Sequence, residues 1–174
     1  MIKLPAIVLL ALGSLTATAQ VSHSSAAISR AVSEQADRMG KLMLAKDFVG
    51  FVKYMNADVL KMIGGKEKVI TTMRSGTTDM KKKGFSFNSV TFGKPSAIID
   101  TAGTLQCILP EQLRIHSPQG DMINHTSLFA LSKDNGKTWT FTEVNPELQS
   151  QLRQIVPVMS SKLKVPPGRK EQVK

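Results

Sequence analysis

The sequence predicts an α+β fold in which three N-terminal helices pack on a strongly bent antiparallel sheet of four to six strands, a cone-like roll. Two observations carry this prediction. As far as Gly84, apolar residues recur every three or four positions, which is the period of amphipathic helices. Beyond Gly84 the period falls to about two, and short turns separate the segments, which favours antiparallel strands.

The first expected helix is long and amphipathic and covers 24–46. Its apolar positions recur at spacings of three and four: Ile28, Val32, Ala36, Met39 and Met43. Asp47 can cap a second, shorter helix that ends near Tyr54. The two helices would form a hairpin.

The third expected helix covers 66–83, after a break in the pattern over 56–65. Gly84 supplies its C-terminal stop. Three lysines at 81–83 occupy its last turn, where they suit the negative end of the helix dipole.

The sheet is expected from five strand-like segments, at 85–92, 97–100, 104–117, 122–132 and 137–144. The alternation slips at Asn88-Ser89, as it does at a β-bulge. Pro110 interrupts the longest segment and predicts an edge or a bulge there. A short helix is expected after Pro146, before Pro157 stops it.

Residues 1–19 are predicted to be a signal peptide, with Lys3, an apolar run and an Ala-Thr-Ala ending before a cleavage site near Ala19/Gln20. The apolar run is about half of the ~20 residues that a membrane-spanning helix needs. We therefore expect an exported protein, periplasmic or extracellular. One domain over 20–156 and a basic, flexible tail over 157–174 complete the predicted organisation.

The chain is basic, with a formal net charge of +10. Its lysines cluster at 81–83 and after Lys162, which favours contact with an anionic envelope surface or, more simply, a solvated helix end and a loose tail. Nucleic acid is not expected, because the lysines are not interleaved with aromatic residues and no known binding module is present.

No motif fixes a reaction, a metal or a cofactor. The chain lacks a nucleophile elbow, a zinc-protease motif, a Walker loop and a dinucleotide fingerprint. Cys107, the single cysteine, lies in the apolar run LQCIL and is expected in the core, without a disulfide. A metal site needs three or four converging His, Cys or carboxylate ligands, and the third histidine, His23, lies just after the predicted cleavage site, so we expect no metal site and no cofactor.

The stretch SKDNGKTWTF at 132–141 matches the S-x-D-x-G-x-T-W box of sialidases. Its spacing has a structural explanation, because Asp134 can bond backbone N–H groups, Gly136 supplies a positive φ and Trp139 packs over the hairpin. A propeller needs several four-stranded blades, for which this chain is too short. The box therefore predicts a hairpin turn.

The helices-then-sheet order, together with the short aromatic helix leading to YMNADVLKMIGGKEKVI, resembles the nuclear transport factor 2-like superfamily. It is especially similar to small exported bacterial members of unassigned function, over roughly 26–144. The resemblance implies a cavity between the concave face of the sheet and the helices. In enzymatic members an Asp or His in that cavity acts as general acid or base.

His125 is the strongest candidate for a functional side chain, because strand parity groups it with Ile123, Phe129 and Leu131 on an apolar face. A half-buried histidine that bonds a strand carbonyl is the competing interpretation. Tyr54 would orient a substrate beside it. The expected pocket wall consists of Phe48, Phe51, Tyr54, Met55, His125, Phe129 and Trp139.

The other isolated polar residues have local explanations. Asp100 and Asp121 lie beside turns, and His116 is expected to face solvent near a hairpin end. The alternate threonines at 138, 140 and 142 describe a sheet face on which a homodimer could form.

Three functions are consistent with this sequence. The favoured one is an exported module that binds an apolar or lipid-like small molecule, or a partner, without catalysis. The second is an isomerase-like or cyclase-like enzyme with His125 as base and Tyr54 as orienting hydroxyl. The third is a structural protein of the cell envelope surface.

Overall fold

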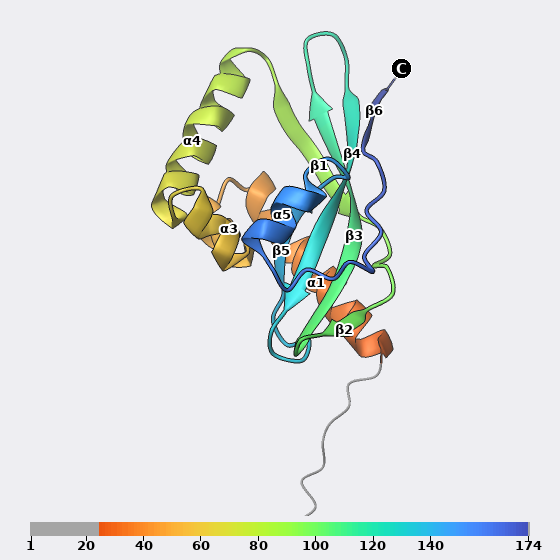
Figure 1. Ribbon diagram of the computed structural model, residues 1–174. Helices are drawn as coiled ribbons and strands as arrows, with labels where there is room; N and C mark the ends of the chain where they lie inside the picture. The colour runs from red at the N-terminus through yellow and green to blue at the C-terminus, as the bar shows by residue number, and fades with distance from the viewer. Residues whose placement is uncertain (1–24, 174) are drawn as a thin grey trace, which may run out of the picture.

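The computed structural model describes residues 25–173, in which helices pack against a six-stranded antiparallel sheet (Figure 1). This confirms the α+β class. The predicted signal peptide, residues 1–19, and its cleavage site near Ala19/Gln20 lie outside the described residues. Within the described part of the chain, no helix is long and apolar enough to cross a bilayer.

Several helical segments come before the first strand: α1 (Ser25–Leu44), α2 (Phe48–Phe51), the 3₁₀ turn η1 (Val52–Tyr54), α3 (Ala57–Met62) and α4 (Lys66–Lys82). The sequence predicted no helix over 56–65, but the structure contains the short helix α3 there. Asn56 caps it by accepting hydrogen bonds from the backbone N–H groups of Asp58 and Val59, at 2.9 and 3.3 Å. A helix of six residues has fewer than two turns, so the sequence shows no clear period there.

The sheet contains β1 (Ser86–Phe92), β2 (Ile99–Thr101), β3 (Thr104–His116), β4 (Met122–Ser132), β5 (Thr140–Val144) and β6 (Arg169–Gln172). The long hairpin β3–β4 forms its centre, with Leu109 opposite Leu128. Strands β1 and β2 share the outer edge of β3, and β5 and β6 share the outer edge of β4. Each edge of the hairpin is thus covered by two short strands.

Both irregularities that the sequence predicted in the sheet are present. The register of β1 against β3 shifts between Phe87 and Ser89, at the expected bulge. Pro110 lies where the partner of β3 changes from β2 to β1. There the Gly93 N–H donates to the Pro110 carbonyl at 2.8 Å, outside any named strand. A proline is tolerated at such an interruption because it has no N–H to donate.

The two faces of the sheet are both buried, which explains the uninterrupted apolar run from Cys107 to Leu109. Helix α1 covers one face, called here the α1 face, whose core is Val32, Ala36, Met39, Cys107, Leu109, Leu128, Ala130, Trp139 and Phe141. Helix α5 (Gln149–Ile155) and the chain after it cover the opposite face, whose core is Val59, Ile108, Phe129, Leu131, Val144, Leu152, Val156, Met159 and Leu163. Figure 1 shows α1 and α5 on opposite sides of the strands.

The C-terminal segment differs from the flexible tail expected over 157–174. Met159 and Leu163 are buried in the core of the opposite face, and β6 pairs with the first half of β4. Lysines and prolines are frequent in this stretch, and its apolar residues follow no regular period. Met159 and Leu163 are buried because the sheet face beneath them is apolar. The sequence of the segment itself does not reveal this contact.

The sialidase-like box closes the turn between β4 and β5, as predicted. The Asp134 carboxylate accepts hydrogen bonds from the hydroxyl of Ser132 and from the backbone and hydroxyl of Thr138, at 2.7–2.9 Å. Gly136 has a φ of 85°, in the left-handed region. The Trp139 indole donates to the Gly136 carbonyl at 3.0 Å and is buried under α1. Asp134, Gly136 and Trp139 are therefore all accounted for by the turn itself.

Candidate functional site

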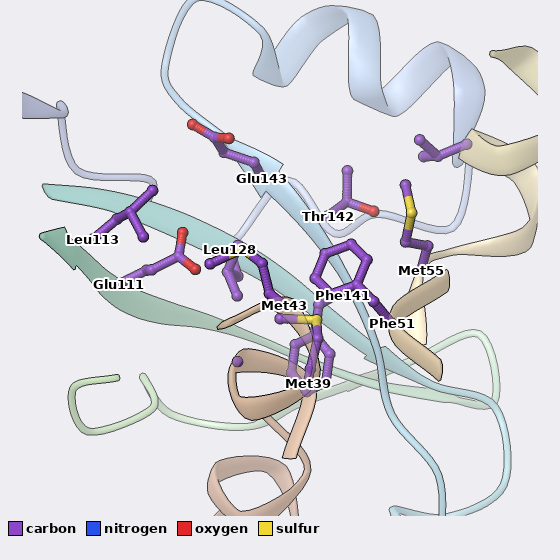
Figure 2. Close-up of a pocket in the computed structure, with 12 residues that line it drawn as sticks. Met39, Met43, Phe51, Met55, Glu111, Leu113, Leu128, Phe141, Thr142 and Glu143 are labelled. Carbon is purple, nitrogen blue, oxygen red and sulfur yellow. The ribbon is translucent and has the colours of Figure 1, made fainter. Parts of the chain in front are cut away.

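A cavity of about 350 Å³ lies between α1, the η1–α3 connection and the α1 face of the sheet (Figure 2). This volume is at the lower end of the range for small-molecule sites, about 300–1,000 Å³. Its wall consists of Met39, Gly40, Met43, Phe51, Met55, Val59, Glu111, Leu113, Leu128, Phe141, Thr142 and Glu143. We call it the main pocket. Apolar side chains, three of them methionines, form most of this wall.

Helix α1 supplies the floor of the main pocket. Met39 and Met43 are four residues apart, so they lie on the same helix face as the buried Val32 and Ala36. Gly40 lets α1 approach β1 closely, since a Cβ at this position would lie 2.5 Å from a methyl carbon of Val90. The close approach of α1 to β1 fixes the height of the two methionines above the sheet.

The segment from Phe51 to Asn56 supplies one side of the main pocket. Met55 forms an isolated parallel bridge with Phe141 on β5, and the buried Asn56 then begins α3. Figure 2 shows Phe51 and Met55 beside Phe141, with Thr142 above them. Methionines have flexible, polarisable side chains, so this wall can adapt to the shape of a ligand.

The polar groups of the main pocket are two glutamates and a threonine. Figure 2 shows Glu111 and Glu143 toward the end opposite Met55. Burial raises the pKa of Glu111, the charge of Glu143 raises it further, and a 2.8 Å hydrogen bond from the Thr126 hydroxyl lowers it in part. The Thr142 hydroxyl oxygen is buried and has no hydrogen-bond partner among residues 25–173.

Two of the side chains predicted to form the pocket wall line the main pocket, namely Phe51 and Met55. Phe48 instead packs between α2, α3 and α4, in a cluster with Val52, Leu60, Val69 and Ile70. Tyr54 packs against the core of the α1 face, of which Trp139 is a buried member. None of the rings of Phe48, Tyr54 and Trp139 lines the main pocket.

His125 does not belong to the main pocket, which corrects the prediction. Strand parity was interpreted rightly, since His125 does share a face with Phe129. That face, however, is the one that α5 and the C-terminal segment cover. The His125 Nε2 lies 3.2 Å from a carboxylate oxygen of Glu171 on β6, and β6 pairs with β4 at this point. Tyr54 lies on the other side of the sheet, so the two do not form a catalytic pair.

The sequence reasoning missed Glu111 and Glu143. Leu109, Glu111 and Leu113 alternate along β3, so Glu111 is a lone charged residue on an apolar face. This is the same signal that singled out His125, and it was available from the sequence. Glu143 carried no such signal, because its neighbours Thr142 and Val144 do not identify the face of a strand as short as β5.

The remaining polar candidates lie away from the main pocket. The Asp121 carboxylate, near the tip of the β3–β4 hairpin, accepts hydrogen bonds from His116 and Arg114 at 2.8 and 2.9 Å. The bond from His116 and, after it, the bond from Arg114 lower the pKa of Asp121. His116 is exposed, as expected, and so is Asp100 on β2. Among residues 25–173, no three His, Cys, Asp or Glu side chains converge as metal ligands would.

Neither a protein-family model nor a curated protein is significantly similar to this chain.

Proposed function

We propose that this chain is an exported module that binds a small, mainly apolar or lipid-like molecule in the main pocket, without catalysis. The observation that carries the proposal is the cavity of about 350 Å³, lined mostly by apolar side chains. Ligand sites typically combine such a wall with a few polar groups that orient the ligand. Here Glu111 and the unpartnered Thr142 hydroxyl would accept or donate hydrogen bonds at the two ends of the pocket.

We extend the proposal to membership of the nuclear transport factor 2-like superfamily, with three main N-terminal helices and a strongly bent roll. Its support is the helices-then-sheet order and the position of the pocket between α1 and the sheet. The same proposal includes export with cleavage near Gln20. It also includes affinity for an anionic envelope surface and formation of a homodimer. Sequencing the N-terminus of the protein secreted by its own host would test the export and the cleavage.

Native mass spectrometry of the protein purified from its host would test the binding function. We expect an additional mass that is lost after denaturation and refolding. A refolded sample should then bind N-phenyl-1-naphthylamine, a neutral apolar fluorophore, with a rise in fluorescence. Absence of both the retained mass and the fluorescence change would count against the proposal.

A pair of tryptophan substitutions locates the site. Met55→Trp replaces a linear side chain on the wall of the main pocket by a larger aromatic one that fills part of the cavity, so it should weaken binding of the fluorophore at least tenfold. Met62→Trp makes the same change at a position on α3 that is 56% exposed and does not line the pocket, so its affinity should stay within about twofold. Equal affinities in the two variants would place the fluorophore elsewhere.

A second candidate function is proton transfer by Glu111. It rests on the position of a carboxyl group in the wall of a mainly apolar pocket, where burial raises its pKa, which is a typical setting for a general acid or base. The retained ligand, once identified, would be incubated with the native protein and with Glu111→Gln. Conversion by the native protein alone would favour the enzyme, and unchanged ligand with both would favour the binding module.

A further inference from the structure

A second hollow, of about 200 Å³, lies between the C-terminal turns of α1 and α4 and the start of β1. Its apolar lining consists of Met43, Leu44, Met80, Phe85 and Phe87, and Lys46, Thr77, Lys81 and Ser86 complete it. Only Met43 also lines the main pocket. The volume corresponds to six or seven water molecules, at about 30 Å³ each, so it can hold part of an alkyl chain.

A cationic crevice adjoins this hollow. It is lined by Lys46, Phe48, Arg74, Thr77, Thr78 and Lys81, and it shares Lys46, Thr77 and Lys81 with the hollow. Arg74 and Lys81 are seven residues apart on α4, with the two threonines between them, so they lie on one face of the helix. Lys46 faces them from the turn after α1.

The three cations at this crevice have no anionic partner among the residues that the structure describes. Lys46, Arg74 and Lys81 make no ion pair with any residue between 25 and 173, whereas the neighbouring Lys82 lies 3.6 Å from Asp79. The helix dipole gives a local reason for Lys81, but its effect is confined to the last turn, and Arg74 lies two turns earlier. Three like charges lining one crevice repel each other, and an anion among them would offset that repulsion.

We propose that the hollow and the crevice together bind a single-chain anionic amphiphile. Its carboxylate or phosphate headgroup would lie among Lys46, Arg74 and Lys81, and its alkyl chain would extend into the hollow toward Met43. Arginine and lysine bind both kinds of headgroup, so the shared chemistry is an anion on an unbranched chain. This site is separate from the main pocket, where Glu111 and Glu143 would repel an anion.

The test is isothermal titration of the refolded protein with decanoate, kept below its critical micelle concentration. The variant Lys46→Gln/Arg74→Gln/Lys81→Gln should bind about tenfold more weakly, because each of the three exposed ion pairs with the headgroup contributes roughly a twofold gain in affinity. The control Lys53→Gln/Lys61→Gln/Lys66→Gln makes the same change in net charge at exposed positions that line neither cavity nor crevice. Its affinity should stay within about threefold, and equal losses in both variants would overturn the proposal.

Three further titrations identify what the site recognises. From hexanoate to octanoate to decanoate, affinity should rise by up to about fourfold for each methylene that the hollow buries. Decyl phosphate should bind as decanoate does. Inorganic phosphate, which lacks the chain, should compete only at much higher concentrations than decanoate. Competition at similar concentrations, or equal affinity for all three chain lengths, would overturn the proposal because the alkyl chain would then contribute nothing.

Met55→Trp separates this proposal from the one for the main pocket. Met55 lines only the main pocket, so this variant should keep the affinity of the native protein for decanoate. If decanoate binding is lost in Met55→Trp and kept in the triple variant, the anion lies in the main pocket and the second site does not exist. If native protein binds the naphthylamine fluorophore but not decanoate, the second site alone fails.

Discussion

Gln106 joins the C-terminal segment to the central hairpin, so its replacement by alanine should destabilise the fold strongly. The side chain is completely buried. Its amide nitrogen donates to the Thr104 hydroxyl and to the Val158 carbonyl, at 2.8 and 2.6 Å. Its amide oxygen accepts from the Ser160 N–H at 2.9 Å. Three hydrogen bonds, two of them to residues more than 50 positions away, therefore depend on one side chain.

The expected loss follows from these contacts. A hydrogen bond contributes about 1 kcal/mol net, so three of them amount to about 3 kcal/mol. The space left by the shortened side chain adds to this figure. We therefore expect Gln106→Ala to lower the free energy of unfolding by about 3–4 kcal/mol.

Urea denaturation, followed by the fluorescence of the buried Trp139, measures this loss. With a denaturant slope of about 2 kcal/mol per molar, the midpoint should fall by about 1.5–2 M. Gln112→Ala is the matched control, since Gln112 lies on the same strand, is exposed and makes no side-chain hydrogen bond within residues 25–173. Its midpoint should shift by less than about 0.3 M, and a shift of the same small size in Gln106→Ala would refute the reasoning.

Two further predictions concern titratable groups. Burial raises the pKa of Glu111, so the folded state binds the carboxyl proton more tightly than the unfolded state does. The protein therefore loses stability as the pH rises through the raised pKa of this group. Glu111→Gln should therefore gain more stability over the native protein at about pH 7.5 than at about pH 4, measured by urea unfolding. Exposed Glu34→Gln is the control, and equal differences at the two pH values would contradict the argument. Burial also raises the pKa of the Cys107 thiol to about 12. This thiol should therefore not react with 5,5′-dithiobis(2-nitrobenzoate) at pH 8 until urea unfolds the chain. Rapid reaction of the folded protein would show that the thiol is accessible and would contradict the prediction.

Sequence periodicity predicted the long elements well. The expected helices at 24–46 and 66–83 correspond to α1 and α4, and the strand boundaries agree to within a few residues. These segments are long enough for a hydrophobic period to repeat several times. The helix α3 was missed because six residues are too few for a period, although Asn56 was a usable capping signal.

The site was predicted only in part, because periodicity shows which residues share a face but not which face the helices cover. His125 and Phe129 were rightly grouped, and they lie on the face away from α1. That face is buried in part by Met159 and Leu163, from a segment that was expected to be loose. Long-range packing of this kind leaves no local signal in the sequence.

Strand β6 also has a consequence for association between molecules. Residues 122–125 of β4 pair with β6 and would otherwise present a row of free backbone N–H and C=O groups. Such an open edge is a template on which a strand of another chain can add, and growth of this kind leads to insoluble aggregates. The outermost strand that replaces it reads Arg169-Lys170-Glu171-Gln172, all exposed and mostly charged. A charged edge strand disfavours the addition of a further strand, so β6 replaces an open edge by one that resists aggregation.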